Sequence, residues 1–412
     1  MEKVKGTRDF YPEDMEIQNY IFNVWRKIAT SYSYKEIEGP ILESAEIYKK
    51  SGEEIPEQTY QLQDKSGRKL VLRPELTPTI ARMITQRKDL SKPIKWFSLP
   101  RCFRYEAPQA GRAREFNQFN IDCLGSESML MDAEIIATSI EIMKAFGLTS
   151  KDFYVRISNR KLLQSFLISL GGVNVKNISR LIDKKDKIGE ETFILSLKDL
   201  NLSQDKIKYL LSFLKIKNIE DLKPYLPDLI GKQGLNEISQ LFSYLKQFNL
   251  LQYCKLDLSI TRGIDYYTST VFEVFDAEGE FRAIAGGGRY DDLAGIPGVG
   301  YAMGDIVLGL FLKKKNKLVI KKESKIYIIY IGNKALKTAF LIAEKLRKSN
   351  IVEMDVMDKG LGKQLAYANQ NDFSFAVIIG EDEIKKGKYK LKDMKTGKEK
   401  LLTINQLENF FE

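Results

Sequence analysis

Hydrophobic and polar positions along the first 150 residues follow two different periods, which predict a mixture of helices and strands. Helical spacing of apolar side chains is seen over residues 13–33, 75–88 and 130–146. Strand-like alternation is seen over residues 95–106 and 114–124, and in a hairpin over 58–73. A polar loop, 107–113, joins the two longer strands.

The middle of the chain changes character twice. Residues 160–250 are rich in Leu, Ile and Lys at helical spacing, which predicts an inserted helical module. Strand character returns over residues 255–275 and 281–285. A glycine loop over 286–292 and a helix over 304–315 are predicted to follow.

Strand and helix patterns alternate in the last quarter of the chain, which predicts a small α/β domain. The predicted strands cover residues 325–331, 352–357 and 375–379, and the predicted helices cover residues 333–348 and 361–370.

At 412 residues the chain is too long for one ordinary hydrophobic core, so several domains are expected. The hydrophilic stretch 313–322 is a plausible linker. We therefore predict one domain over residues 1–318, interrupted by the helical insertion at 160–250, and a second domain over residues 323–412.

The chain contains no histidine, which excludes several classes of enzyme. A Ser-His-Asp triad, an HExxH zinc site and a histidine general base are all impossible. The three cysteines, Cys102, Cys123 and Cys254, form no CxxC pair, so we expect reduced thiols and no metal site. Phosphoryl and nucleotidyl transfers remain possible, because they depend on positioning and cations more than on a tuned base.

Charge and hydropathy bear on partners and location. No apolar run approaches the roughly 20 residues of a membrane span, and the N-terminus has no apolar signal core, so a cytoplasmic protein without membrane contact is expected. The net charge is +10, and residues 313–412 hold 22 Lys+Arg and 13 Asp+Glu, a difference of +9. A basic terminal domain indicates a polyanionic partner, although a solvated lysine-rich surface would show the same excess.

Strand parity over residues 114–124 suggests a polar site. Phe116, Gln118, Asn120 and Asp122 share one face, and the other face is apolar enough to pack. Pairing with the preceding strand would bring three further polar residues to the same surface, namely Arg104, Glu106 and Arg112. A solvated sheet face with surface ion pairs is the alternative.

Two later segments could approach a ligand. Gly263 interrupts a strand-like run and would allow a bulge beside Arg262, which could reach an anion. Tyr266 and Tyr267 would need polar partners if buried, but aromatic pairs are more often part of the core. The glycines at 286–288 would let backbone N–H groups approach a ligand, with Arg289 adding a cation, although a tight turn would use the same residues.

Six segments together resemble the histidyl-tRNA synthetases, a family of class II aminoacyl-tRNA synthetases. The segments are KGTRDF (5–10), PELT (74–77), CFRYE (102–106), REFNQ (114–118), ITRGIDYY (260–267) and AGGGRYD (285–291). The resemblance covers nearly the whole chain, is weakest over 160–250, and is closest to archaeal members.

The resemblance implies an α+β fold with a class II antiparallel-sheet catalytic domain, a helical insertion and a C-terminal α/β anticodon-binding domain. It implies ATP-dependent ligation of histidine to tRNA-His through a histidyl-adenylate. ATP would be a substrate, Mg²⁺ would accompany it, and the insertion would clamp the tRNA acceptor stem. A homodimer is implied because residues 40–55 resemble the class II dimer segment, and two-fold closure is the commonest assembly.

Carried over position by position, the resemblance also implies functional residues. Histidine would be bound by Glu75, Thr77, Gln118, Asp122, Tyr267 and Tyr290. ATP would be bound by Arg104, Glu106, Arg112 and Arg262. The implied catalytic residues are Arg104 and Arg262, which would stabilise charge at the α-phosphate. Asp122 would accept a hydrogen bond from the imidazole ring, and its mismatch with other side chains would give selectivity.

The sequence departs from the family pattern at two positions. Val307 stands where class II enzymes usually carry an arginine that covers the adenine, so the adenine contact is unassigned. Asn117 stands where relatives often have an aromatic residue or histidine. By strand parity Asn117 faces away from Gln118, so little functional effect is expected.

Three other interpretations remain open at this point. A regulatory paralogue of the family acts as an adaptor in histidine biosynthesis, but lacks the anticodon-binding domain that is predicted here. A tRNA-sensing domain would share the fold, and another class II amino-acid specificity would share the catalytic domain.

Overall fold

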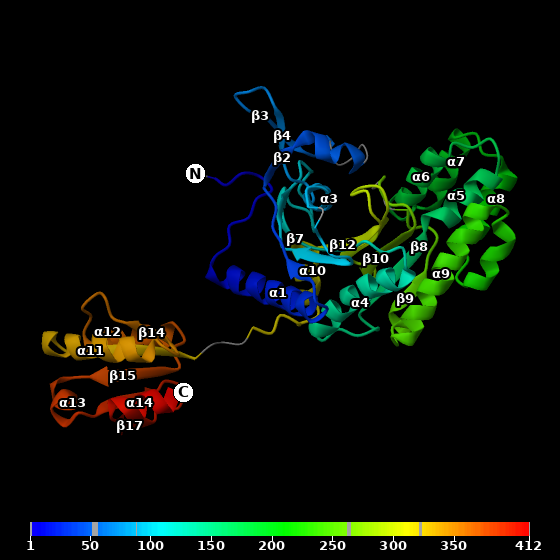
Figure 1. Ribbon diagram of the computed structural model, residues 1–412. Helices are drawn as coiled ribbons and strands as arrows, with labels where there is room; N and C mark the ends of the chain where they lie inside the picture. The colour runs from blue at the N-terminus through cyan, green and yellow to red at the C-terminus, as the bar shows by residue number, and fades with distance from the viewer. Residues whose placement is uncertain (1, 52–56, 88, 262–264, 321–323, 412) are drawn as a thin grey trace. The chain divides into compact units, whose positions relative to one another are not determined.

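The structure is a computed structural model that describes residues 2–51, 57–87, 89–261, 265–320 and 324–411. The chain divides into two compact units, Met1–Val319 and Ile320–Glu412, and each is described by itself (Figure 1). No helix among the described residues is long and apolar enough to cross a membrane.

A nine-stranded sheet forms the centre of the first unit. Its strands follow the order β1-β5-β7-β12-β11-β10-β8-β9, and β6 pairs with β7 off this path. All neighbours are antiparallel except β1 with β5 and β8 with β9. The bounds are β1 (Lys35–Glu36), β5 (Ile94–Ser98), β6 (Arg101–Phe103), β7 (Glu115–Leu124), β8 (Phe153–Asn159), β9 (Cys254–Leu256), β10 (Thr270–Asp276), β11 (Ala285–Tyr290) and β12 (Gly298–Gly304).

Three helices cover one face of this sheet: α1 (Pro12–Ser31), α4 (Met129–Ala145) and α10 (Asp305–Lys314) (Figure 1). Trp25 of α1 is fully buried and stacks on Phe119 of β7, with ring centroids 5.6 Å apart. Ile121 and Cys123 join the same core, so the odd-numbered side chains of β7 face the helices. This confirms the strand parity predicted for residues 114–124.

The opposite face of the sheet carries a smaller set of elements. A three-stranded sheet has the order β2-β4-β3, and the helical segments η1 and α3 accompany it. Leu76 and Ile80 at the start of α3 pack against Tyr290 of β11 and Leu124 of β7. The bounds are β2 (Leu42–Ser44), η1 (Ala45–Ser51), β3 (Tyr60–Gln63), β4 (Lys69–Leu72) and α3 (Thr77–Thr85).

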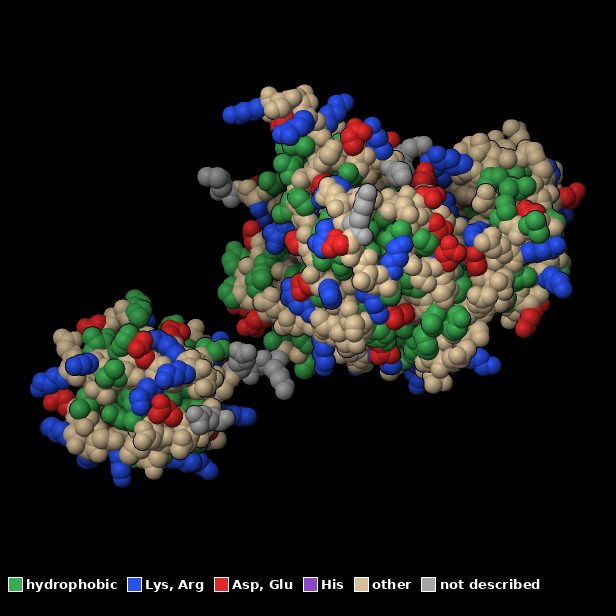
Figure 2. Space-filling view, viewed as in Figure 1, with side chains coloured by type: hydrophobic (Ala, Val, Ile, Leu, Met, Phe, Trp, Pro, Cys, Tyr) green, Lys and Arg blue, Asp and Glu red, His purple; other side chains and the backbone are tan. Residues whose placement is uncertain are grey.

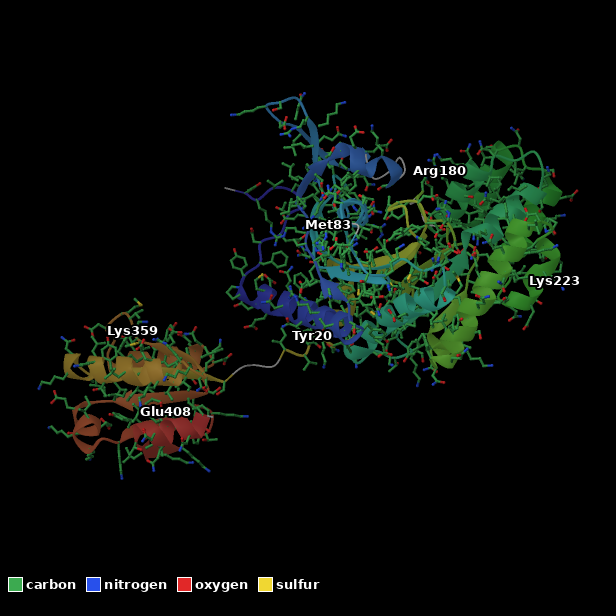
Figure 3. All side chains as sticks on the ribbon, viewed as in Figure 1. Tyr20, Met83, Arg180, Lys223, Lys359 and Glu408 are labelled. Carbon is green, nitrogen blue, oxygen red and sulfur yellow. The ribbon has the colours of Figure 1, made fainter. Side chains whose placement is uncertain are left out.

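The predicted helical insertion lies between β8 and β9. Phe166 of α5 stacks on Phe213 of α8 at 4.0 Å, and both rings belong to a core that continues into the main sheet. Its elements are α5 (Arg160–Ser169), α6 (Val175–Ile188), α7 (Glu190–Asp199), α8 (Gln204–Leu214), η2 (Ile219–Tyr225), α9 (Leu229–Gln247) and η3 (Leu251–Tyr253). Figure 3 marks Arg180 on α6 and Lys223 in η2, at opposite sides of the insertion.

The second unit is an α/β domain, as predicted. Its sheet has the order β14-β13-β15-β16-β17, in which the first two pairings are parallel and the last two pairings are antiparallel. Separate apolar clusters fill its two sides, one with α11 and α14 and one with α12. The bounds are β13 (Lys325–Tyr330), α11 (Asn333–Leu346), β14 (Ile351–Met354), α12 (Leu361–Gln370), β15 (Phe375–Ile379), α13 (Glu381–Lys386), β16 (Tyr389–Asp393), β17 (Glu399–Leu402) and α14 (Ile404–Phe411).

Four sequence predictions were wrong in detail, and one of them is the strand predicted over 281–285, of which only Ala285 belongs to a strand. The strand predicted over 95–106 is interrupted at Leu99 and Pro100, because proline has no N–H to donate to a strand neighbour. The strand predicted over 255–275 is two strands, and the described residues between Leu256 and Thr270 form turns and bends. The glycine loop predicted over 286–292 is mostly strand, since β11 continues to Tyr290.

The glycines of β11 serve close packing between strands. A Cβ atom added to Gly287 would lie 2.2 Å from the carbonyl oxygen of Gly300 on β12. A Cβ atom added to Gly300 would in turn lie 2.3 Å from Asp122 Oδ1 on β7. Real Cβ atoms do not approach oxygen this closely, so these strands require residues without side chains at both positions.

We expect Gly287→Ala to destabilise the first unit by about 1–3 kcal/mol or more, because overpacking forces the strands apart. Gly309→Ala in α10 is the control: its Cβ would make ordinary contact with Ile21 at 3.9 Å, and alanine gains about 0.5–1 kcal/mol in a helix. Urea unfolding measures both. Equal stability of the two variants would show that the glycine strand is not tightly constrained.

Candidate active site

A cavity of about 320 Å³ opens on the face of the main sheet that α1, α4 and α10 leave uncovered. Nine of the ten site residues predicted from the sequence line it: Glu75, Thr77, Arg104, Glu106, Arg112, Gln118, Asp122, Tyr267 and Tyr290. The tenth, Arg262, lies outside the described residues. The structure thus gathers residues from β7, β11, α3 and several loops around one pocket.

Asp122 forms the most deeply buried part of this pocket. Tyr290 donates a hydrogen bond to its Oδ1 atom at 2.6 Å, while the buried Oδ2 atom has no hydrogen-bond partner among the described residues. Burial raises the pKa of Asp122 to about 7, the bond from Tyr290 opposes this rise, and the charge of Glu75 adds to it. A buried carboxylate oxygen without a donor is costly, so this end of the pocket favours a ligand that carries an N–H or O–H group.

A second carboxylate lies at the start of α3. Ser51 donates to Glu75 Oε1 at 2.6 Å, and Tyr266 donates to Oε2 at 3.1 Å. Thr77 opens α3 beside it, and Gln118 reaches the same pocket from β7. A carboxylate with a hydroxyl and an amide nearby can surround an ammonium group, which needs up to three acceptors.

The rings of Tyr266, Tyr267 and Tyr290 pack together beside the two carboxylates. Tyr266 meets Tyr267 edge to face at 5.0 Å and meets Tyr290 edge to face at 5.8 Å, which is a favourable geometry for aromatic pairs. Burial raises the pKa of Tyr266 and of Tyr290 well above the usual value, and nearby carboxylate charges add to the rise. Both hydroxyls therefore stay protonated and serve as donors.

The other end of the pocket carries the cations. Arg104 donates from Nε to the carbonyl of Pro74 at 2.9 Å, and its guanidinium lies over the ring of Phe116 at 5.3 Å. Arg112 forms an ion pair with Glu106 at 2.8 Å. Guanidinium groups fixed in this way can bind phosphate oxygens with little loss of side-chain entropy.

Val307 lines the pocket near this cationic end. A Cβ atom added to Gly111 would lie 3.1 Å from Val307 Cγ2, so the α10 helix and the loop of Gly111 approach closely there. The contact is apolar. A flat ring bound here would meet the hydrophobic side chain of Val307, where class II enzymes usually place an arginine.

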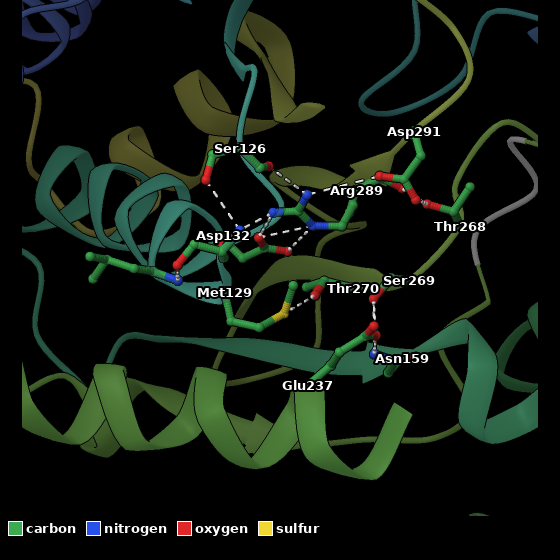
Figure 4. A network of polar contacts seen from close by, with 12 residues as sticks. Ser126, Met129, Asp132, Asn159, Glu237, Thr268, Ser269, Thr270, Arg289 and Asp291 are labelled. Atoms are coloured by element: carbon green, nitrogen blue, oxygen red, sulfur yellow. Dashed lines mark hydrogen bonds and ion pairs between the residues drawn. The ribbon is translucent and has the colours of Figure 1, made fainter. Parts of the chain in front are cut away.

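Arg289, which the sequence suggested as a cation for a ligand, points away from the pocket. It is buried in a bidentate ion pair with Asp132 of α4 and donates to the carbonyl of Ser126 at 3.0 Å (Figure 4). The reason is parity: Tyr290 and Arg289 are neighbours on β11, so their side chains lie on opposite faces. The expectation of a ligand contact was wrong at this residue.

The pocket also contains residues that the sequence reasoning did not select. The polar residues that line it and were given no ligand role are Gln58, Asn120, Asp183, Tyr266, Glu273, Arg282, Tyr301 and Asp305. Strand parity placed Asn120 on the same face as Gln118 and Asp122 but assigned no ligand to it. No local signal places Asp183, which reaches the pocket from α6 of the insertion. Asn117 faces away, as predicted, and donates to Asp305.

A sequence model described as Histidyl-tRNA synthetase matches residues 6–304, and one described as Anticodon binding domain matches residues 325–412. The chain belongs to the histidyl-tRNA synthetase family. The match spans most of the main sheet, the pocket and the insertion, and it confirms the family resemblance seen in the sequence.

Relatives of this synthetase chain match it from end to end. A histidine–tRNA ligase of Thermoplasma volcanium is 37% identical and is covered over 98% of its length by 100% of this chain. Another of Opitutus terrae is also 37% identical, over 96% of this chain and 94% of the relative. A third, of Pyrococcus furiosus, is 35% identical over 100% of this chain and 98% of the relative.

Solved structures agree with the class II synthetase fold. The crystal structure of histidyl-tRNA synthetase from Nostoc sp. PCC 7120 superposes with a TM-score of 0.83 at 26% identity, over 100% of this chain and 98% of that chain. A Bacillus halodurans structure, titled as an ATP phosphoribosyltransferase regulatory subunit/histidyl-tRNA synthetase, has a TM-score of 0.79 at 24% identity, over 92% and 98% of the two chains. At that identity the second likeness shows the fold alone.

Because its pKa is raised, Asp122 should make the protein less stable as the pH rises. The folded protein holds the Asp122 proton up to about pH 7, whereas an unfolded chain releases it near pH 4, so wild-type stability falls as pH rises between these values. Asp122→Asn cannot ionise. Its stability relative to wild type should therefore grow by about 2–3 kcal/mol between pH 5 and pH 8, at about 1.4 kcal/mol per pH unit within the window.

Urea unfolding of both proteins at pH 5 and pH 8 measures this difference. A difference that stays constant across the two pH values would mean that Asp122 has an ordinary pKa and is solvated.

Proposed function

We propose that this chain binds histidine and ATP in the pocket described above, joins them as histidyl-adenylate, and transfers the histidyl group to tRNA-His. The proposal rests on the Oδ2 atom of buried Asp122, which has no hydrogen-bond partner among the residues that the structure describes. An imidazole N–H is the donor that this atom needs, and few amino-acid side chains place such a donor at that depth.

Histidine would lie along β7, with its ring at Asp122 and its α-ammonium group near Glu75. Asp122 accepts a hydrogen bond from the ring, and the hydroxyl of Tyr290 keeps the carboxylate oriented. Tyr267 packs against the ring. The α-ammonium group lies near Glu75, Thr77 and Gln118, which would provide its acceptors.

ATP would place its phosphates at the cationic end of the pocket. Arg104 contacts the α-phosphate and the reacting carboxylate, Arg112 contacts the β- and γ-phosphates, and Glu106 approaches the adenine side. Arg262 would add a second cation at the α-phosphate. Val307 and Phe116 offer the adenine ring apolar and aromatic surfaces, which supports binding without an arginine on α10.

The chemistry needs no histidine base. The carboxylate of the bound histidine is ionised near neutral pH and attacks the α-phosphorus, and pyrophosphate leaves. Arg104 and Arg262 stabilise the negative charge that grows on the phosphate oxygens. A ribose hydroxyl of the tRNA then attacks the acyl carbon of the adenylate, and AMP leaves.

Mg²⁺ fits this pocket as an ion held mainly by ATP. Among the described residues no group of three or more Cys, Asp or Glu side chains gathers to form a protein cage. Mg²⁺ commonly binds through substrate phosphates with one or two carboxylates, and Glu273, which lines the pocket from β10, would provide one. The ion would neutralise charge on the phosphates.

The second unit would bind the anticodon region of the tRNA. Residues 325–412 match the anticodon-binding family, and they hold 16 Lys+Arg and 12 Asp+Glu, an excess of 16 − 12 = +4 charges. Lysine and arginine side chains spread over the face of this unit that Figure 2 shows. Positive charge of this kind attracts a phosphate backbone. We infer that the insertion clamps the acceptor stem. We also infer that the enzyme acts in the cytoplasm as a homodimer whose interface includes residues 40–55.

The adaptor and sensor interpretations have less support. The regulatory paralogue lacks an anticodon-binding domain, whereas this chain matches that domain over residues 325–412. The relatives that match this chain over nearly its full length carry the name histidine–tRNA ligase.

The test of the proposed function is exchange of pyrophosphate into ATP, with each common amino acid supplied separately to the purified protein. Exchange with histidine alone is expected. Exchange with another amino acid would contradict the role of Asp122, and a folded protein without any exchange would favour the adaptor.

We expect Asp122→Ala to raise the KM for histidine by about 10²-fold, because the ring loses its buried acceptor, while the KM for ATP changes little. Glu115→Ala is the control, since its side chain lies on the same strand and pairs with Arg101 at 3.0 Å. An equal loss of affinity for both substrates would refute the role of Asp122 in side-chain recognition.

For Arg262→Ala we expect adenylate formation to slow by about 10²-fold or more, because one charge-stabilising group is lost at the phosphate. Single-turnover measurement of the adenylate gives the rate, and thermal unfolding checks that stability is unchanged. Normal turnover would remove Arg262 from the catalytic residues.

A further inference from the structure

Residues 265–269, which precede β10, bring Tyr266 and Tyr267 into the pocket, and the described residues Thr261 and Ser269 both bond to the helical insertion. Thr261 donates from its hydroxyl to the carbonyl of Ser179 and to Asp183 Oδ1, both at 3.2 Å and both on α6. Ser269 donates to Glu237 Oε2 on α9 at 2.5 Å.

Glu237 of α9 binds Ser269 and two other side chains. Its Oε1 atom pairs with Lys161 at 2.5 Å, and its Oε2 atom also accepts from Asn159 at 2.9 Å. Asn159 donates to Ser269 as well, at 3.0 Å. Figure 4 shows Glu237 reaching from α9 to the Ser269 and Asn159 side chains. The carboxylate is only 13% exposed, so its bonds are shielded from water.

Burial opposes ionisation of Glu237, but hydrogen bonds from Lys161, Ser269 and Asn159 outweigh it and lower the pKa of the carboxyl group. Glu237 is therefore an ionised acceptor at neutral pH, and hydrogen bonds to a charged acceptor are stronger than neutral ones.

The packing of α9 makes this reach possible. Gly234 lies one helical turn before Glu237, and a Cβ atom added there would lie 3.0 Å from Lys161 Cβ and 3.1 Å from the Leu162 nitrogen. The absence of a side chain lets α9 approach the start of α5 closely. Glu237 is thereby held beside the segment that follows the pocket tyrosines.

The main sheet holds the same segment from the other side. Thr268 donates from its backbone to the carbonyl of Arg289 at 2.8 Å and from its hydroxyl to Asp291 at 2.5 Å. Arg289 is in turn paired with Asp132. Tyr267 thus immediately precedes two residues, Thr268 and Ser269, that are bound to different parts of the protein.

We propose that Glu237 is a positioning residue for histidine binding: through Ser269, the helical insertion sets the place of the Tyr266–Tyr267 segment in the pocket. This inference rests on the proposed function. The insertion then has a role in amino-acid binding besides any contact with tRNA. A shift of α9 would change histidine binding more than ATP binding.

The proposal predicts a split between substrates. Glu237→Gln keeps the size of the side chain and removes its charge, so the Ser269 attachment weakens. In pyrophosphate exchange we expect its KM for histidine to rise by about tenfold and its KM for ATP to change less than about twofold, a shift in one substrate that a general loss of folding would not produce. Ser269→Ala removes the other partner and should show the same split, and it carries the test if Glu237→Gln does not fold.

A double-mutant cycle tests whether the two residues act through their contact. The Glu237→Gln/Ser269→Ala protein should resemble either single variant, because the second change has no further contact to remove. Ser239→Ala is the control on the same helix, since its hydroxyl bonds only within α9, to the Leu235 carbonyl at 2.6 Å.

Equal changes in both KM values would overturn the proposal in an enzyme that uses histidine, and so would additive effects of the two substitutions. Unchanged kinetics in both variants would also overturn it. That result would mean that the contacts of Thr268 with Arg289 and Asp291 position the tyrosines without Glu237. A wild-type protein without histidine-dependent exchange would overturn the proposed function itself, and this inference with it.

Discussion

The pocket depends on one buried carboxylate, Asp122, whose Oδ2 atom has no hydrogen-bond partner among the described residues. Tyr290 donates to Asp122 Oδ1, and burial raises the pKa of Asp122 to about 7 because the interior disfavours the charged form. A bound ring N–H would supply the missing partner. Selectivity then follows from a penalty on wrong amino acids as well as from attraction of the right one, because a side chain without that donor leaves the buried oxygen unpaired.

The surrounding fold keeps this carboxylate in place from three directions. Side-chain-free positions at Gly287 and Gly300 let β11 and β12 pack closely, so that Tyr290 reaches Asp122. Beneath β11, the Arg289–Asp132 pair joins the strand to α4, and a buried pair of this kind fixes geometry more than it adds stability. Glu237 of the insertion holds the neighbouring tyrosine segment, which links a peripheral helical module to the amino-acid site.

Periodic features of this chain could be predicted from its sequence, and features set by distant contacts could not. Parity placed Gln118 and Asp122 on one face of β7 because side chains alternate strictly along a strand. The glycines at 286–288 were assigned to a loop because local propensity cannot reveal a close neighbouring strand. Asp183 and Glu237 were missed because they lie on helices of the insertion, 78 and 32 residues away in sequence from their partners Thr261 and Ser269.

The most direct test of the account is calorimetric binding of L-histidine and of L-β-(2-thienyl)alanine to the wild-type protein without ATP. The two amino acids have five-membered aromatic rings of similar size, but the thienyl ring has no N–H group. If Asp122 Oδ2 selects a ring donor, the thienyl analogue should bind at least about 10³-fold more weakly than histidine. Binding of the two within about tenfold of each other would contradict the account and mean that the pocket recognises ring shape alone.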